Sequence, residues 1–325
     1  MLNNTEKVTS ISITGGTGFI GRRLIKAWSD FPELELRILA RSNPDPRLLK
    51  APNARWFHGD LENLEMLDGF LAPGGVLVHL AYPHAPDWNL SRHLLSAEKL
   101  GRLAATAGVK RVVLCSSAVV VGNAKALRVD EDTVCSPVTD YERAKLGIEQ
   151  TFAASGKDAY QLAVLRPTAV LGPGGRNLFK LACNLVRSSR TDRAVNYLRS
   201  SLCGRRRMNL VCVENVVAAL DFLVRREQTM PHDVFLVSDD DDPLNNFRAI
   251  EIELMRRLGV ADYAMPPLPL PPQILSGILR LCGRGCADPR RVYDGSRLVR
   301  AGYKKTSTII QSLERFASYF KGISP

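Results

Sequence analysis

A glycine-rich turn near the N-terminus constrains the fold more than any other segment of this chain. Residues 14–21 read Thr-Gly-Gly-Thr-Gly-Phe-Ile-Gly, after an apolar, β-branched run at 8–14 and overlapping a stretch of helical spacing at 19–28. Any strand-to-helix turn can use glycine, but this context favours a dinucleotide site, with the pyrophosphate at the helix N-terminus. Gly15 would permit the tight turn, Gly18 the approach of the pyrophosphate and Gly21 close packing of helix on strand.

Two kinds of apolar segment, one short and one long, alternate through the first half of the chain. Short strand-like runs alternate with longer stretches of helical spacing, the pattern of parallel strands joined by crossover helices. We therefore expect an α/β fold with a Rossmann-like, doubly wound parallel sheet. The strands are expected at 8–14, 34–40, 55–57, 76–80, 111–115 and 161–165, and the helices at 19–28, 94–107 and 140–154, the last capped by Asp140.

The pattern loosens after Pro167, and residues 265–272 contain five prolines, which exclude a regular helix or central strand. We expect a Rossmann domain for NAD(P) at residues 1–170, to which residues 208–240 return. Residues 171–207 and 241–325 are expected to form a smaller C-terminal substrate-binding lobe. A chain of 325 residues is long enough for two such parts.

Composition excludes several classes of protein. The 44 Lys and Arg against 33 Asp and Glu give a net charge of +11, but no zinc finger or helix-turn-helix signature accompanies it, so nucleic acid is not an expected partner. No apolar run approaches the roughly 18 residues of a membrane span, and the polar start lacks a signal-peptide core.

Seven scattered cysteines suit reduced thiols in the cytoplasm. The closest pair, Cys282 and Cys286, has no matching ligand pair, so no metal site is expected.

The end of the second expected strand bears on which dinucleotide is bound. A carboxylate there binds the adenosine ribose hydroxyls of NAD, whereas a basic residue suits the 2′-phosphate of NADP. The sequence has Leu-Ala-Arg-Ser at 39–42 with no acid, so Arg41 favours NADP(H), with NAD(H) as the alternative.

Four residues supply the elements of proton transfer: Ser116 or Ser117, and Tyr141 with Lys145. Tyr141 and Lys145 are one helical turn apart and share a face. A free tyrosine has a pKa of about 10, and a neighbouring ammonium lowers it by favouring the phenolate. A serine hydroxyl at the end of the fifth expected strand can hydrogen-bond the reacting oxygen.

With these motifs the chain resembles the extended short-chain dehydrogenase/reductase family, and within it the nucleotide-sugar epimerases, dehydratases and 4-ketoreductases of polysaccharide and O-antigen pathways. Residues 59–61, 78–81, 113–122, 166–167, 172–174, 293–297 and 301–303 carry the likeness beyond the glycine turn. The resemblance implies Ser117, Tyr141 and Lys145 as the catalytic set, and a homodimer. It implies Ser117, Tyr141, Asn177 and Arg207 at a nucleotide-sugar substrate. The cofactor-binding residues that the resemblance and the motifs together imply are Gly15, Gly18, Phe19, Ile20, Gly21, Arg41, Asp60, Leu61, Leu80, Ala81, Tyr82, Lys145 and Pro167.

The chain departs from the family at four positions. His93 stands where many members have asparagine, and Met208 where an arginine usually holds the pyrophosphate, which leaves Arg207 beside it as the substitute. Tyr82 occupies a position that is usually small, and Leu171 replaces a common tyrosine. These differences concern the substrate and not the fold.

The resemblance implies redox chemistry at carbon 4 of a nucleotide sugar. Because the ribose-binding acid is missing, we favour an NADPH-dependent 4-reductase of a nucleotide 4-keto-6-deoxysugar. The alternative is a UDP-hexose 4-epimerase with the same Ser117, Tyr141 and Lys145. Less favoured are a reductase of a non-sugar ketone and a non-catalytic NADP-binding regulator.

Overall fold

The computed structural model describes residues 8–46, 48–62, 68–82, 89–187, 189–227, 232–268, 271, 273–275, 277 and 288–323. The chain divides into two compact units, which are described separately. Unit 1 comprises Met1–Val120, Thr139–Arg166 and Val217–Phe235, and unit 2 comprises Val121–Val138, Pro167–Val216 and Leu236–Pro325. The packing of a unit does not say what it binds, so the expected cofactor and substrate domains remain predictions.

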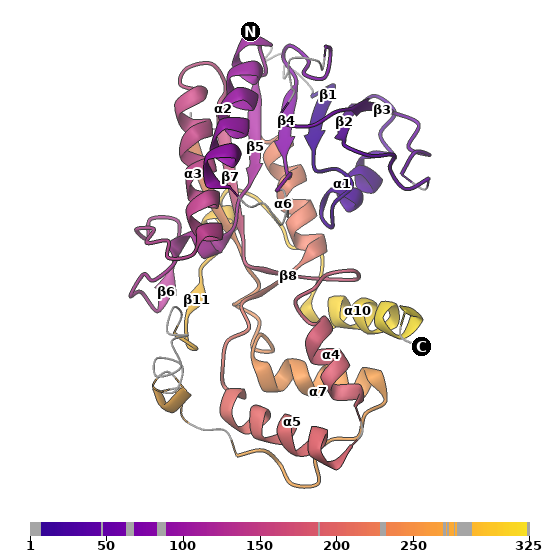
Figure 1. Cartoon of the computed structure of the whole chain (residues 1–325), viewed down its shortest axis with the longest axis vertical. Helices are drawn as coiled ribbons and strands as arrows, with labels where there is room; N and C mark the ends of the chain where they lie inside the picture. Colours follow the sequence, from indigo (N-terminus) through magenta and orange to yellow (C-terminus); the bar gives the residue numbers. More distant parts are fainter. Residues whose placement is uncertain are drawn as a thin grey trace. The chain divides into compact units, whose positions relative to one another are not determined.

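A seven-stranded parallel sheet is the framework of unit 1 (Figure 1). Its order is β10-β7-β5-β4-β1-β2-β3, so the chain runs outward in both directions from the β1–β4 pair. The bounds are β1 Ser10–Thr14, β2 Glu35–Ala40, β3 Ala54–His58, β4 Val76–His79, β5 Arg111–Cys115, β7 Gln161–Pro167 and β10 His232–Val237. This confirms the predicted α/β, Rossmann-like sheet. In such sheets ligands bind outside the carboxyl ends of the strands, where the order reverses.

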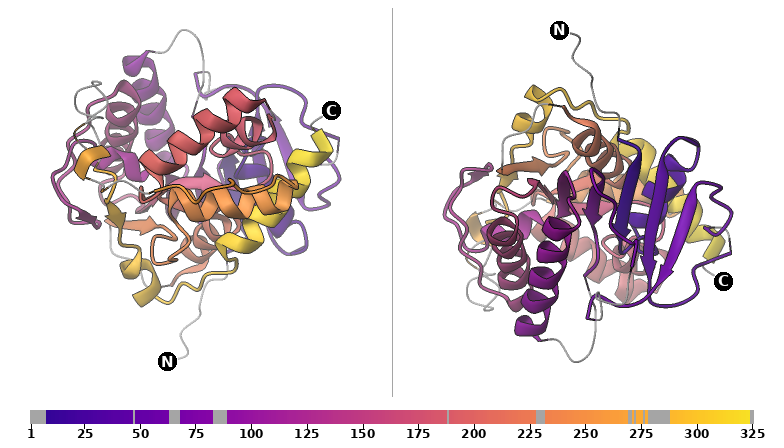
Figure 2. Two further views of the ribbon diagram at one scale, coloured as in Figure 1. Left: turned by 90° about the horizontal axis from the view of Figure 1, so that it is seen from below. Right: turned by 90° about the horizontal axis from the view of Figure 1, so that it is seen from above.

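Helices cover the sheet of unit 1 because each buries one apolar stripe on it. The helices are α1 Gly21–Trp28, α2 Leu90–Thr106, α3 Asp140–Ser155 and α6 Val213–Arg225, the last of which begins in unit 2. The pair α2 and α3 packs side by side, as the right view of Figure 2 shows, and its side chains join the sheet in one buried cluster that includes Leu100, Phe152 and Val112. On α1, Trp28 is buried and its Nε1 donates to Asp221 of α6 at 2.6 Å.

The start of α3 differs from the prediction by one residue. Thr139, not Asp140, is the cap: its hydroxyl accepts the N–H of Glu142, and the Glu142 carboxylate accepts the N–H of Thr139. Asp140 is already the first helical residue, because Thr139 has the extended backbone that a capping residue needs. This capping box fixes the register of the helix that carries Tyr141 and Lys145.

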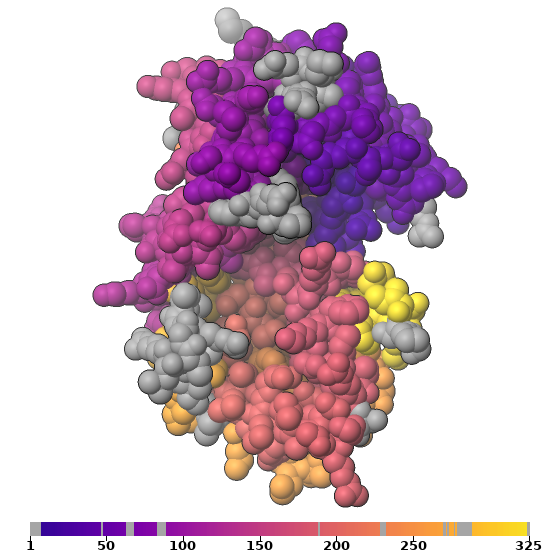
Figure 3. Space-filling model, viewed as in Figure 1, coloured from indigo at the N-terminus to yellow at the C-terminus, as the bar shows by residue number. Residues whose placement is uncertain are grey.

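Unit 2 is built from short strands and five described helices. Strands β8 Ala169–Leu171 and β9 Leu210–Cys212 pair in parallel, as do β6 Arg128–Val129 and β11 Val292–Tyr293. The helices are α4 Phe179–Val186, α5 Arg190–Cys203, α7 Phe247–Leu258, α9 Ser296–Arg300 and α10 Ile309–Ile323. Side chains of α4, α7 and α10 bury a second core with β8 and β9, and α5 forms much of the visible surface of this unit in Figure 3.

Two expected features of the C-terminal part lie wholly or partly outside the described residues. These are the Cys282 and Cys286 pair and part of the proline-rich stretch at 265–272. Within the described part of the chain, no helix is both long enough and apolar enough to cross a bilayer.

Candidate active site

The glycine turn packs so closely on the end of β4 that side chains are excluded from it. Gly15 has a φ of +73°, and a Cβ there would lie 2.6 Å from the backbone nitrogen of Ala81. A Cβ on Gly21 would lie 2.4 Å from the carbonyl oxygen of Gly15. Gly18 donates its N–H to that same carbonyl at 3.0 Å, which closes the turn before α1 begins. The backbone therefore has the form that a dinucleotide pyrophosphate requires.

Hydrogen bonds tie β1 to β4 directly below this turn. The Leu80 N–H donates to the Thr14 carbonyl at 3.0 Å, and Thr14 Oγ1 lies 2.7 Å from His79 Nδ1 in a second hydrogen bond. Burial lowers the pKa of His79 to about 3, with the Lys145 charge as a smaller cause, so this imidazole is neutral. Sequence reasoning did not single out His79 or its bond to Thr14. A titratable residue that ends an apolar strand beside the turn was the available signal.

The predicted residues for the adenosine half follow β2 and β3. Arg41 comes directly after β2, and its Nη1 lies 4.0 Å from the Asp60 carboxylate, with both side chains largely exposed. The Gly59 N–H donates to the Ala40 carbonyl at 3.0 Å and holds the two strand ends together. Leu61 is partly buried against the sheet core. This edge thus presents a cation where NAD-specific proteins of this fold present an acid.

Phe19 and Ile20 stand between the glycine turn and α1. The Phe19 carbonyl accepts a hydrogen bond from Arg23 at 2.8 Å, and the Arg23 guanidinium lies 4.6 Å from the centroid of the Phe19 ring. Ile20 precedes the first helical residue, Gly21. Pro167, the last predicted cofactor residue, ends β7.

Ser117, Tyr141 and Lys145 come together in unit 1, as the sequence predicts. Ser117 follows the carboxyl end of β5, and the other two lie one turn apart on α3. Tyr141 is 39% exposed, whereas Lys145 is buried. Partial burial raises the pKa of Tyr141 to about 12, against the effect of a hydrogen bond with Ser117. The neighbouring Ser116 is buried, and its hydroxyl finds no hydrogen-bond partner among the described residues.

Burial, and not the Lys145 ammonium expected from the spacing, is the main influence on the Tyr141 pKa in this structure. Its Nζ donates to the Cys115 carbonyl at 3.1 Å and lies 4.8 Å from the centroid of the Tyr82 ring. The ammonium is therefore directed to the β5 carbonyl and the aromatic face, and burial dominates the Tyr141 pKa. Burial also lowers the pKa of Lys145. At neutral pH Tyr141 carries its proton.

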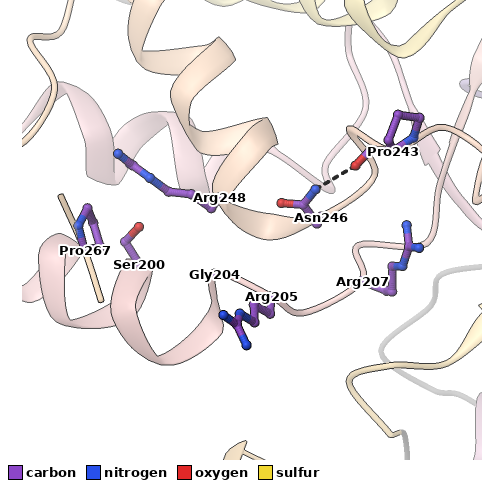
Figure 4. Close-up of a pocket in the computed structure, with 8 residues that line it drawn as sticks. All are labelled: Ser200, Gly204, Arg205, Arg207, Pro243, Asn246, Arg248 and Pro267. Atoms are coloured by element: carbon purple, nitrogen blue, oxygen red, sulfur yellow. Dashed lines mark hydrogen bonds between the residues drawn. The ribbon is translucent and has the colours of Figure 1, made fainter. Parts of the chain in front are cut away.

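The predicted substrate residues Asn177 and Arg207 lie in unit 2. Arg207 lines a pocket of about 460 Å³, which Figure 4 shows with Arg205, two residues earlier in the chain, and Arg248 from α7. Among the described residues the Arg205 and Arg207 guanidinium groups form no side-chain hydrogen bond, and the Arg207 charge acts on Asp240, whose pKa it lowers against the effect of burial. Asn177 is not among the lining residues, and its side-chain amide donates to the Val170 carbonyl at 2.8 Å.

The Arg248 guanidinium is held in place by acidic neighbours. It contacts Glu251 at 3.0 Å and Asp262 at 2.8 Å, and the buried Glu251 also accepts a 2.5 Å hydrogen bond from Ser200. Sequence reasoning missed the role of Arg205 and Arg248 in this pocket. Only the run of three arginines at 205–207 signalled it.

Comparisons with known proteins agree with this geometry. The model of the NAD dependent epimerase/dehydratase family matches residues 11–237. A UDP-glucose 4-epimerase of Vibrio cholerae is 27% identical over 275 residues, 81% of this chain and 79% of that protein. A 4-hydroxy-2-methyl-3-oxo-4-farnesyl-3,4-dihydroquinoline-1-oxide ketoreductase of Stigmatella aurantiaca is 27% identical over 185 residues, 55% of each chain.

Solved structures give the same fold over nearly the whole length. The Bordetella bronchiseptica enzyme WbmG, solved with NAD and UDP, superposes with a TM-score of 0.71 at 18% identity and covers 97% of this chain and 96% of its own. At that identity the likeness concerns the fold. Together with the family match over more than two thirds of the sequence, it shows that this chain is an enzyme of the NAD dependent epimerase/dehydratase family, the extended short-chain dehydrogenase/reductase type.

Proposed function

We propose that this enzyme is a nucleotide-sugar 4-epimerase, with Ser117, Tyr141 and Lys145 as its catalytic residues. One observation carries the proposal: the glycine turn and these three side chains lie at the carboxyl end of one sheet within unit 1. The Vibrio cholerae UDP-glucose 4-epimerase, which aligns with most of the chain, supports this reading over the reductase favoured by the sequence alone.

The residues of the glycine turn fit a nicotinamide dinucleotide, because its backbone leaves no room for side chains at Gly15 and Gly21. When bound, that cofactor supplies the acceptor and donor of a hydride. Gly15, Gly18 and Gly21 would receive the pyrophosphate, and Lys145 would hold the nicotinamide ribose. Arg41 supports NADP(H) over NAD(H), although WbmG was solved with NAD.

Proton transfer is the task of this chain's own side chains. Tyr141 would take the proton of the sugar 4-hydroxyl when carbon 4 is oxidised and return it when carbon 4 is reduced. Ser117 would hydrogen-bond the same oxygen. The protonated phenol is the form that donates. In the opposite direction, the Lys145 ammonium one helical turn away would favour the phenolate. His79 stays neutral and positions the end of β4 through Thr14.

The arginine-lined pocket of unit 2 supports a phosphate-bearing substrate. Arg205 and Arg207 line this pocket, and charge-assisted hydrogen bonds from arginine suit phosphate oxygens. We therefore assign the nucleotide diphosphate of the substrate to Arg207, with Arg205 as its neighbour. Asn177 does not line this pocket, and its contact with the phosphates stays a prediction.

A second candidate, an NADPH-dependent 4-reductase of a nucleotide 4-keto-6-deoxysugar, is favoured by Arg41. An exposed cation after β2 suits NADP(H), and a reductase consumes one reduced cofactor per turnover whereas an epimerase consumes none. The same Ser117, Tyr141 and Lys145 serve both reactions.

The experiment that separates them follows product and cofactor together. The purified enzyme is incubated with UDP-glucose or UDP-galactose, alone and with NAD or NADP, and separately with a nucleotide 4-keto-6-deoxysugar and NADPH. We expect the two UDP-hexoses to interconvert with no net change in cofactor absorbance. Stoichiometric oxidation of NADPH with the keto sugar, and no hexose interconversion, would instead establish the reductase. Inactivity in every arm would overturn both assignments.

A further inference from the structure

Tyr82 lies against both of the proposed proton-transfer residues. Its ring is edge-on to the Tyr141 ring, with centroids 5.0 Å apart and planes at 85°. The Lys145 Nζ lies 4.8 Å from the centroid of the same ring. His93 stacks on the Tyr82 ring at 5.4 Å with an interplanar angle of 12°. One aromatic side chain thus contacts the acid, the cation and a third titratable residue.

The physical character of these contacts gives Tyr82 more than a lining role. The face of an aromatic ring carries negative charge and attracts an ammonium, most strongly where water is excluded, and Lys145 is buried. An edge-to-face pair holds two rings in a defined relative orientation. The ammonium also donates to the Cys115 carbonyl at 3.1 Å. Without the ring of Tyr82, the Lys145 ammonium would lose its cation–π contact and the Tyr141 ring would lose its edge-to-face contact.

We propose that Tyr82 is a positioning residue, whose ring holds the Lys145 ammonium and the Tyr141 ring in place while His93 stacks on it. The proposal rests on the proposed function in assigning Tyr141 and Lys145 to proton transfer. It differs from the cofactor-binding role predicted for Tyr82, because here Tyr82 orients two other side chains of the site. We assign this role to the ring, because the ring makes the contacts with Tyr141, Lys145 and His93.

Two substitutions separate the ring from the hydroxyl. Tyr82→Phe keeps the aromatic face, and Tyr82→Leu keeps apolar bulk without it. Phe31→Leu is the matched control, because the Arg225 guanidinium lies 4.8 Å from the Phe31 ring centroid in the same unit. Thermal melting of each variant reports folding independently of activity.

The first readout does not depend on the substrate. Trace acetylation at several pH values, followed by mass spectrometry of the Lys145 peptide, measures how freely the deprotonated amine reacts. We expect Tyr82→Leu to raise the Lys145 labelling rate about five- to tenfold, the worth of a desolvated cation–π contact. Tyr82→Phe and Phe31→Leu should leave it within about twofold of wild type.

The second readout compares two kinetic parameters of the proposed reaction, kcat and the KM of the nucleotide sugar. Tyr82→Leu should lower kcat about tenfold, with KM nearly unchanged and full rescue by Tyr82→Phe. Unchanged labelling in a folded Tyr82→Leu variant would overturn the proposal, as would Tyr82→Phe behaving like Tyr82→Leu. An enzyme inactive on every nucleotide sugar that still shows the labelling difference would contradict the proposed function and leave the role of Tyr82 standing.

Discussion

The candidate active site of unit 1 and the arginine-lined pocket of unit 2 are built by opposite means. In unit 1 the glycine turn meets Ala81 backbone to backbone, and Lys145 is buried with its ammonium on a carbonyl. In unit 2 Arg205 and Arg207 line a pocket with side chains that make no hydrogen bond to the described residues. Packing thus fixes the proposed reaction chemistry, whereas the proposed substrate binding rests on side chains that can change with little effect on the fold.

Removing one hydroxyl from the active site should give the largest effect on activity. Tyr141→Phe keeps the ring that packs on Tyr82, so we expect kcat to fall on the order of 10² to 10⁴, the usual contribution of a positioned acid or base. Cofactor affinity should hardly change, because we assign that binding to the glycine turn and Lys145. Turnover and the cofactor dissociation constant check both. Tyr319→Phe, at a tyrosine of nearly equal exposure, is the control, and near-normal turnover of Tyr141→Phe would mean that another group is the acid.

Two glycines of similar φ test whether the turn of unit 1 is fixed by close packing. Gly15 has φ +73° and Gly174 has φ +79°, but a Cβ on Gly174 would meet only the Tyr319 hydroxyl at 3.8 Å, an ordinary contact. We expect Gly174→Ala to cost about 1–2 kcal/mol of unfolding free energy from backbone strain alone. Gly15→Ala should cost more, because it also drives a methyl group into the Ala81 backbone, and it should weaken dinucleotide binding. Urea denaturation measures both, and equal losses would show that close packing adds nothing.

Substitutions in the pocket of unit 2 should raise the KM of the nucleotide sugar and leave the stability of the protein unchanged. Arg207→Ala should raise the KM of the nucleotide sugar about 10- to 100-fold, the range expected for hydrogen bonds to charged groups, with Arg205→Ala weaker. Arg190→Ala, an exposed arginine of the same unit, is the control. Steady-state kinetics with the hexose nucleotide, and inhibition by UDP, provide the measurement. A change in kcat with KM unchanged would mean that Arg207 acts in the chemical step. It would then contradict the assignment of this pocket to substrate binding.

The smallest effect is expected at Arg41. Its side chain is 68% exposed and pairs with Asp60 only at 4.0 Å, so solvent screens its charge. Arg41→Ala should lower the preference for NADP over NAD by about fivefold or less. Titration of both dinucleotides, followed by intrinsic fluorescence, measures the ratio. If the ratio of the two dissociation constants does not change, residues other than Arg41 determine the choice of cofactor.

The sequence predicted unit 1 better than unit 2 for a physical reason. Buried parallel strands and a glycine turn leave local patterns, and each expected strand from 8–14 to 161–165 overlaps a strand of the sheet. Helices α5, α7 and α10 were not predicted, because α5 mixes charged residues with few apolar ones and all three follow segments of irregular spacing.

Within the site, residue identities were predictable and orientations were not. The spacing of Tyr141 and Lys145 correctly places them on one helix face, but it does not show that the ammonium turns to the Cys115 carbonyl and Tyr82. The bond between Thr14 and His79 joins residues 65 positions apart, which no local pattern contains. Burial, which the packing of distant segments creates, is the main cause of the shifted pKa values of His79 and Tyr141.

Hydrogen transfer at carbon 4 tests the central claim most directly. UDP-glucose carrying deuterium at carbon 4 is incubated with the wild-type enzyme and with Tyr141→Phe, and the hexose products are analysed by NMR and mass spectrometry. The account predicts UDP-galactose that retains the deuterium at carbon 4, formed by the wild type and at least about a hundredfold more slowly by Tyr141→Phe. Deuterium that accumulates in free reduced cofactor, or no UDP-galactose at all, would contradict it.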